Sequence, residues 1–240
     1  MERKNVSLMG DGVVTGGSYG KVSIMGSGKV LGEMDAEHLP ILGSLVTENH
    51  IKVRVLSVSG DGNFKDVTAQ EIGIMGNGKF TGRMETGKLT IAGNAEVAGD
   101  VKADEISIRG SLEAKNVESE ELNCHGTFEV ETLNANNIKI KLGSNCRAEE
   151  IGGGTIQVRY PRVRKILVDI GEILLFRKIK RAELKADTIE ADRIELENTV
   201  ASSVKGSNIV IGPGCKIRNL EYREHVYIDS SAVVEHYEKV

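Results

Sequence analysis

Residues 56–66 and 72–82 read LSVSGDGNFKD and IGIMGNGKFTG, two versions of one phrase. In each, apolar residues occupy alternate positions up to a glycine, and three further residues lead to the next apolar position. Apolar residues at every second position are typical of a β-strand with one buried face. The phrase recurs along more than half of the chain, so this stretch determines the fold.

The recurrence is nearly constant in step. Successive copies begin 16 or 17 residues apart, which is too short for helix-pair repeats of more than about thirty residues. Each unit has room for three short strands and three corners, as residues 106–121 illustrate with apolar pairs before and after Gly110. The copies start at residues 6, 22, 39, 56, 72, 89, 106, 122 and 138.

These repeats predict an all-β fold, a parallel β-helix (solenoid) with rungs of 16–17 residues. The composition agrees, because 4% aromatic residues, no tryptophan and 28 glycines suit a core one side chain deep. Corners favour residues that tolerate positive φ, which we expect of Gly76 and Gly110. Stacking should place one apolar ladder on the inside: Val22, Leu39, Leu56, Ile72, Leu89, Ile106 and Leu122.

The pattern is interrupted once. The repeat breaks at the glycines of 152–154, and strand-like alternation returns only after residue 182. We therefore expect an N-terminal β-helix over 1–154, a basic and apolar insert or linker over 155–181, and a short C-terminal β-helical segment over 182–240. The sequence leaves open whether the second stack continues the first or folds back on it.

The insert carries the one local concentration of positive charge. One interpretation is contact with an anionic membrane surface or an acidic partner, because basic residues beside an apolar strip can anchor at headgroups. The contact residues would be Arg177, Lys178, Lys180 and Arg181. The other interpretation is a salt-bridged insert that faces the acidic run Glu183, Asp187, Glu190, Asp192, Glu195 and Glu197.

Charge and cysteine content exclude several classes of protein. Lys and Arg number 31 against 35 Asp and Glu, a net charge of −4, whereas a dedicated nucleic-acid binder is usually basic. Cys124, Cys146 and Cys215 form no C-x-x-C pair, which argues against a disulfide framework and a zinc knuckle. No apolar signal region follows Met1, and the longest apolar stretch, 166–176, is too short for a bilayer. We expect a cytoplasmic protein, free or associated with a membrane surface.

No motif predicts catalysis, a cofactor or a metal. GSGK (26–29) and GNGK (76–79) lack the spacing of a P-loop, and the GDG phrases lack the recurring aspartate of a calcium β-roll. IGPGCKI (211–217) is similar to a turn of the left-handed β-helix acyltransferases, but their strict six-residue spacing is absent. The histidines share no spacing that would build a catalytic column: His38, His50, His125, His225 and His236.

This glycine-punctuated, aromatic-poor series resembles the bactofilin family of polymer-forming cytoskeletal proteins, clearly over 6–150 and more loosely over 182–234. The resemblance implies a right-handed β-helix that assembles end to end into nucleotide-independent filaments. Such filaments act as scaffolds in bacterial cell shape, polar organisation or motility. The implied partners are further copies of the chain and a paralogous bactofilin, with no nucleic acid.

The ends of a solenoid favour assembly. A solenoid ends in open rungs with unpaired backbone groups, and the sequence shows no capping helix at either end. Pairing like ends closes a two-fold contact, and alternating such contacts gives a filament. The expected self-assembly residues are Val6, Leu8, Val226 and Ile228. Two alternatives to the scaffold stay open, a non-polymerising adaptor or assembly factor and an acyltransferase-like β-helix enzyme.

Overall fold

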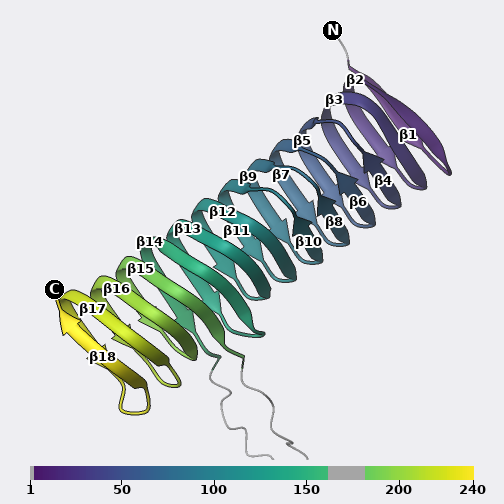
Figure 1. Ribbon diagram of the computed structural model, residues 1–240. Coiled ribbons are helices and arrows are strands. Elements are labelled where there is room, and N and C mark those ends of the chain that lie inside the picture. Colours follow the sequence, from purple (N-terminus) through teal and green to yellow (C-terminus); the bar gives the residue numbers. More distant parts are fainter. Residues whose placement is uncertain (1–2, 162–181) are drawn as a thin grey trace, which may run out of the picture.

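The structure is a computed structural model that describes residues 3–161 and 182–240. These residues form β-strands and no α-helix, and every pair of strands in the sheet is parallel. Figure 1 shows the strands stacked into one elongated column, with the two termini at opposite ends. The predicted all-β solenoid is confirmed, while the handedness implied by the resemblance stays a prediction.

The strands follow one another around the column in chain order. They are β1 (Lys4–Leu8), β2 (Gly12–Ile24), β3 (Ser27–Ile41), β4 (Ser44–Thr47), β5 (Ile51–Val58), β6 (Asp61–Phe64), β7 (Val67–Ile74), β8 (Asn77–Phe80), β9 (Met84–Ile91), β10 (Asn94–Val97), β11 (Val101–Ile108), β12 (Ser111–Cys124), β13 (Thr127–Lys141), β14 (Cys146–Arg159), β15 (Leu184–Leu196), β16 (Thr199–Ile211), β17 (Lys216–Ile228) and β18 (Val233–Lys239).

One rung shows how the sequence repeat becomes structure. In β11 and the start of β12, alternate side chains point inward as three pairs, one for each face of the column. β11 pairs with β9 on one side and with β12 on the other, so each backbone edge is used. The inward side chains of this rung are all buried: Val101, Ala103, Ile106, Ile108, Leu112 and Ala114.

The predicted inward ladder is confirmed and runs the length of the stack. Each residue pairs in register with its equivalent one rung away, for example Leu89 with Ile106 and Ile106 with Leu122. Burial of each such aliphatic side chain stabilises the fold by roughly 1.5–3 kcal/mol. The full ladder is Val6, Val22, Leu39, Leu56, Ile72, Leu89, Ile106, Leu122, Ile138, Ile156, Ile194, Ile209 and Val226.

The corner glycines are where the sequence placed them, but the expected positive φ is wrong. Among the described glycines only Gly10, Gly17, Gly32 and Gly214 have positive φ. At Gly76 a Cβ atom would lie 2.1 Å from the carbonyl oxygen of Gly60, and at Gly110 it would lie 1.9 Å from that of Gly93. Glycine is required here because successive rungs approach too closely for any side chain. The glycines of this column that meet the rung beneath are Gly26, Gly43, Gly60, Gly76, Gly93, Gly110 and Gly126. Gly10, at the start of the column, differs because it has positive φ and a Cβ atom there would touch nothing.

The stack does not break at residues 152–154. β14 continues through them to Arg159 and pairs with β15, so the second stack continues the first. The boundary that we predicted after residue 154 therefore lies inside a strand, and Ile156 belongs to the inward ladder rather than to the insert. In the sequence the three glycines interrupt the alternation and look like the end of the repeats. In the structure Gly153 lies where two rungs approach closely, because a Cβ atom there would lie 2.0 Å from the Ala135 oxygen.

Two phenylalanines fit inside the narrow core because glycines make room for them. The rings of Phe64 and Phe80 are buried and stacked with centroids 4.9 Å apart. A Cβ atom on Gly62 would lie 2.4 Å from the Phe64 ring, and one on Gly78 would lie 2.9 Å from the Phe80 ring. Each glycine thus holds an inward position open for the ring two residues later.

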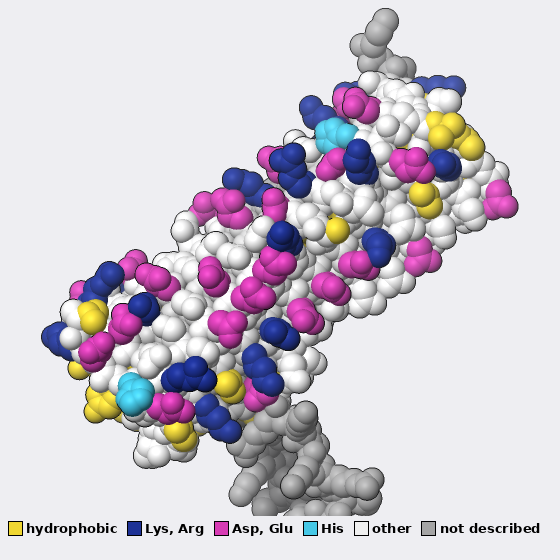
Figure 2. Space-filling model, in the orientation of Figure 1, with side chains coloured by type: hydrophobic (Ala, Val, Ile, Leu, Met, Phe, Trp, Pro, Cys, Tyr) yellow, Lys and Arg dark blue, Asp and Glu magenta, His cyan; other side chains and the backbone are white. Residues whose placement is uncertain are grey.

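Charged side chains cover the outside and pair between neighbouring rungs. Lys79 contacts Glu96 at 2.6 Å and Lys102 contacts Glu118 at 3.3 Å, each pair one repeat apart. Figure 2 shows basic and acidic side chains spread along the visible face of the column. Exposed pairs of this kind contribute little stability, about 0–1 kcal/mol each, so the core and the backbone ladders hold the stack together.

Candidate functional site

The four predicted self-assembly residues lie at the two ends of the column. Val6 and Leu8 are in β1, and Val226 and Ile228 are in the last part of β17. All four are half-buried and pack against the hydrophobic core on their inner side. Each has one neighbouring rung instead of two, so part of its apolar surface faces outward along the column axis.

The N-terminal end exposes a backbone edge. Among the described residues β1 pairs with β2 alone, which leaves its outer N–H and C=O groups without a strand partner. Open edges of this kind are ready templates for pairing with another chain. No helix covers the edge in the part of the chain that the structure describes. The end therefore combines apolar side chains with unpaired backbone.

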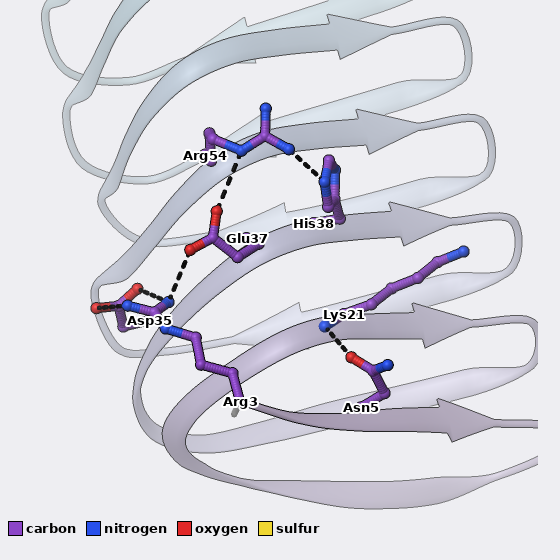
Figure 3. A network of polar contacts seen from close by, with 7 residues as sticks. All are labelled: Arg3, Asn5, Lys21, Asp35, Glu37, His38 and Arg54. Carbon is purple, nitrogen blue, oxygen red and sulfur yellow. Dashed lines mark hydrogen bonds and ion pairs between the residues drawn. The ribbon is translucent and has the colours of Figure 1, made fainter. Parts of the chain in front are cut away.

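A polar network holds β1 in place, as Figure 3 shows. The Arg3 guanidinium lies 2.9 Å from Asp35 and 3.5 Å from Glu37, residues two repeats further along the chain. Glu37 also contacts Arg54 at 3.1 Å, and Arg54 contacts His38. Arg3 was not predicted from the sequence, although its separation from Asp35, 32 residues or two repeat steps, places the two side chains in one column.

The Asn5 side chain makes a further tie at this end. Its oxygen accepts a 2.8 Å hydrogen bond from the backbone N–H of Lys21 (Figure 3). Close by, Gly20 leaves room for this side chain, since a Cβ atom there would lie 2.6 Å from the Asn5 oxygen. Together with Arg3, Asn5 keeps the exposed strand ordered and its apolar positions in register.

The C-terminal end is open in the same way. β18 pairs with β17 only over Lys216–Tyr222, so among the described residues no strand covers the segment with Val226 and Ile228. Beside it, Asp229 accepts hydrogen bonds from the Ser231 hydroxyl at 2.6 Å and N–H at 2.9 Å, which lower the pKa of Asp229. The end is also rich in exposed apolar and aromatic side chains: Tyr227, Val233 and Tyr237.

The four basic residues proposed for an anionic surface, Arg177, Lys178, Lys180 and Arg181, lie outside the described residues. Arg159, which ends β14 within the range predicted for the insert, forms ion pairs with Glu195 and Glu197, and the Tyr160 N–H donates to Glu197 at 2.8 Å. The salt-bridged interpretation thus holds for Arg159. The ranges 3–161 and 182–240 contain no helix that could span a membrane.

The described residues contain no group of three or more His, Cys, Asp and Glu side chains that could hold a metal ion. Two histidines have polar contacts that belong to the surface, His38 with Arg54 and His50 with Thr68 at 3.0 Å. The described histidines do not gather at any one place on the column.

The three cysteines are buried and free. Burial raises the pKa of Cys215 to about 11, and a hydrogen bond with Cys146 followed by burial raises that of Cys124, whereas the same hydrogen bond lowers the pKa of Cys146. Because all three thiols lie in the core, out of reach of a reagent even where the thiolate is favoured, we expect Ellman's reagent at pH 8 to label the native protein very slowly and the urea-unfolded protein fully. Rapid labelling of all three thiols in the native protein would contradict their place in the core.

Comparison with known proteins gives two relatives from Bacillus subtilis (strain 168). The chain is 40% identical over 104 residues to the uncharacterized protein YhbE and 40% identical over 91 residues to the uncharacterized protein YhbF. The first match covers 43% of this chain and the second 38%, and the chain spans 40% and 34% of these relatives' lengths. No family model matches the chain. No solved structure matches it significantly.

Proposed function

We propose that this protein is a bactofilin-like cytoskeletal scaffold whose column-shaped subunits join end to end into filaments without nucleotide. The observation that carries the proposal is the pair of uncovered end rungs, with Val6 and Leu8 at one end and Val226 and Ile228 at the other. End-to-end contact would bury these residues and pair the open backbone edges of β1 and β17. Filaments of this kind would organise a bacterial process such as cell shape or motility.

The continuity of the stack supports this role. A single inward ladder connects the two ends, so each subunit is one stiff rod rather than two bodies joined by a linker. The corner glycines add to the stiffness because they bring neighbouring rungs into close contact. A rod that is apolar at both ends elongates when copies meet, since the contact repeats without closing.

Sedimentation of the purified full chain tests the proposal. We expect the protein to pellet at high speed above a threshold concentration, and the pelleted fraction to be the same with and without ATP or GTP. A chain that remains in the supernatant at every concentration would overturn the filament and favour a non-polymerising adaptor. Pelleting that requires nucleotide would overturn the nucleotide-independent mechanism.

The basic insert gives a separate prediction about membranes. Changing Arg177, Lys178, Lys180 and Arg181 together to glutamate should abolish binding to vesicles that contain anionic lipid, because the attraction of basic residues to such a surface is electrostatic. The β-sheet signal in circular dichroism should be retained, because the strands of the described rungs pair with one another without these residues. Wild-type protein that ignores anionic vesicles in a flotation assay would remove the membrane interpretation.

A further inference from the structure

A row of exposed apolar side chains follows one corner of the column. The residue before each corner glycine points outward, and equivalent positions stack because their backbones pair one rung apart, for example the N–H of Met25 with the Leu8 oxygen and that of Met75 with the Val58 oxygen. Met9 is 79% exposed, Leu42 is 64% and Met75 is 65%. We call this row the methionine ridge, formed by Met9, Met25, Leu42, Ser59, Met75 and Ala92.

Short side chains flank the methionine ridge on both sides, so the ridge stands above its surroundings. On one side lies a column of small residues in register, which includes Ser57, Gly73 and Thr90. On the other lies a column of short polar residues, in which Asn77 donates to Asp61 at 2.9 Å and Asn94 donates to Asn77 at 3.1 Å. Beyond Ala92 the same position is charged or titratable, with Arg109 and then His125.

We infer that the methionine ridge binds the methionine ridge of a second copy, with the two columns antiparallel and the two-fold axis between Leu42 and Ser59. An isologous contact of this kind places each residue column against its own reversed copy. Leu42 then faces Ser59 of the second copy and Met9 faces Ala92, a large side chain against a small one in both cases. Met25 faces Met75, two flexible side chains that adapt to one another.

The polar column fits the same register. Reversal about this axis places Asp61 opposite Ser44 and Asp11 opposite Asn94, so a hydrogen-bond donor faces each carboxylate. Ser27 then faces Asn77. A parallel two-fold contact would instead place each ridge residue against its own copy, large against large at Met9 and small against small at Ala92, so the two ridges would pack unevenly. An antiparallel contact shifted by two rungs would place Asp11 against Asp61, where like charges repel.

The small-residue column allows the two backbones to approach closely. The same reversal sets Pro40 opposite Ser57 and Ser23 opposite Gly73, and none of these side chains is large enough to hold the columns apart. In the next column outward on this side, Lys21 falls opposite Glu71, an attractive pair. In the corresponding column on the polar side, Lys29 falls opposite Lys79, and each of these charges is already paired within its own copy, with Glu48 at 3.4 Å and with Glu96 at 2.6 Å. A second copy of the chain is the occupant that these observations select, because its side chains repeat at the same rung spacing of about 4.8 Å.

A contact along six rungs is short, about 25 Å at that spacing. It buries less than the roughly 800 Å² per partner of a standard stable interface, so one isolated pair of subunits associates weakly. In a filament the contact repeats with each subunit, and linked weak contacts add to strong association. The inference therefore rests on the proposed function for its strength, and it predicts filaments that associate laterally in pairs, with antiparallel subunits at each lateral contact.

Thiol crosslinking of full-length variants tests the register. We expect a short bismaleimide to join Met25→Cys to Met75→Cys when the two variants are mixed, with about tenfold more dimer than either variant gives alone, since only the mixture holds the two thiols together. Met9→Cys with Ala92→Cys should behave in the same way. Arg109→Cys, in the same row but outside the ridge, is the matched control, and the three native cysteines are buried.

Each outcome decides between the arrangements. Met25→Cys that crosslinks with itself as well as with Met75→Cys would overturn the antiparallel register, and crosslinking no better than that of Arg109→Cys would overturn the ridge as an interface. Electron microscopy of the same samples separates this inference from the proposed function. Filaments without the mixed crosslink overturn only the ridge contact, whereas the mixed crosslink without filaments supports the ridge and overturns the filament.

Discussion

Replacing Gly110 with alanine should destabilise the stack by about 3 kcal/mol or more, at the upper end of what overpacking usually costs. The added Cβ atom would lie 1.9 Å from the backbone oxygen of Gly93. Backbone cannot move aside there without breaking hydrogen bonds of the neighbouring rung, in which the Ser111 N–H donates to that same oxygen at 2.9 Å. Thermal denaturation followed by circular dichroism measures the effect.

Gly73→Ala is the matched control. Gly73 belongs to a rung of the same stack, but a Cβ atom there would meet nothing closer than the Leu56 oxygen at 4.0 Å. Its melting temperature should stay within a few degrees of wild type, or rise, because alanine restricts the unfolded chain. Equal melting temperatures for Gly110→Ala and wild type would show that the corner rungs are not in close contact.

The second large effect concerns assembly. Ile228→Asp, and separately Leu8→Asp, should give folded protein that no longer elongates, because an end-to-end contact would bury an unpaired carboxylate, which is strongly unfavourable. In the isolated subunit both side chains are only half-buried, so the aspartate can reach water and the fold is kept. Light scattering should fall to that of monomers or dimers, while circular dichroism retains the β-sheet spectrum.

Two control variants separate assembly from folding. Val210→Asp changes an outward side chain of β16 that is 41% exposed and should affect neither property. Ile106→Asp buries a charge between two covered rungs and should unfold the chain. If Ile228→Asp and Leu8→Asp both scattered light as strongly as wild type, the end rungs would not be the contact.

Because the sequence repeats, most of the fold could be predicted from it. The inward ladder from Val22 to Leu122 follows from apolar alternation at a fixed step, and the structure places these residues as predicted. The corner glycines were predicted for the same reason, but the physical reason why glycine is needed there was not. The sequence alone does not distinguish a glycine needed for positive φ from a glycine needed because two rungs approach closely, since the second depends on the position of the neighbouring rung.

Other features depend on contacts across rungs that no local pattern contains. Ile156 follows three glycines and precedes a basic stretch, so its alternation was too short to identify as a strand. The network of Arg3 with Asp35 and Glu37 becomes visible only when rungs two steps apart are stacked. For the candidate site, the sequence located the four end-rung residues, but not the open edge that β18 leaves along β17.

Negative-stain electron microscopy of the pure wild-type protein, without nucleotide, tests the central claim most directly. We expect long unbranched filaments whose width is that of one column or of two laterally paired columns. Fields of single short rods at high protein concentration would contradict it.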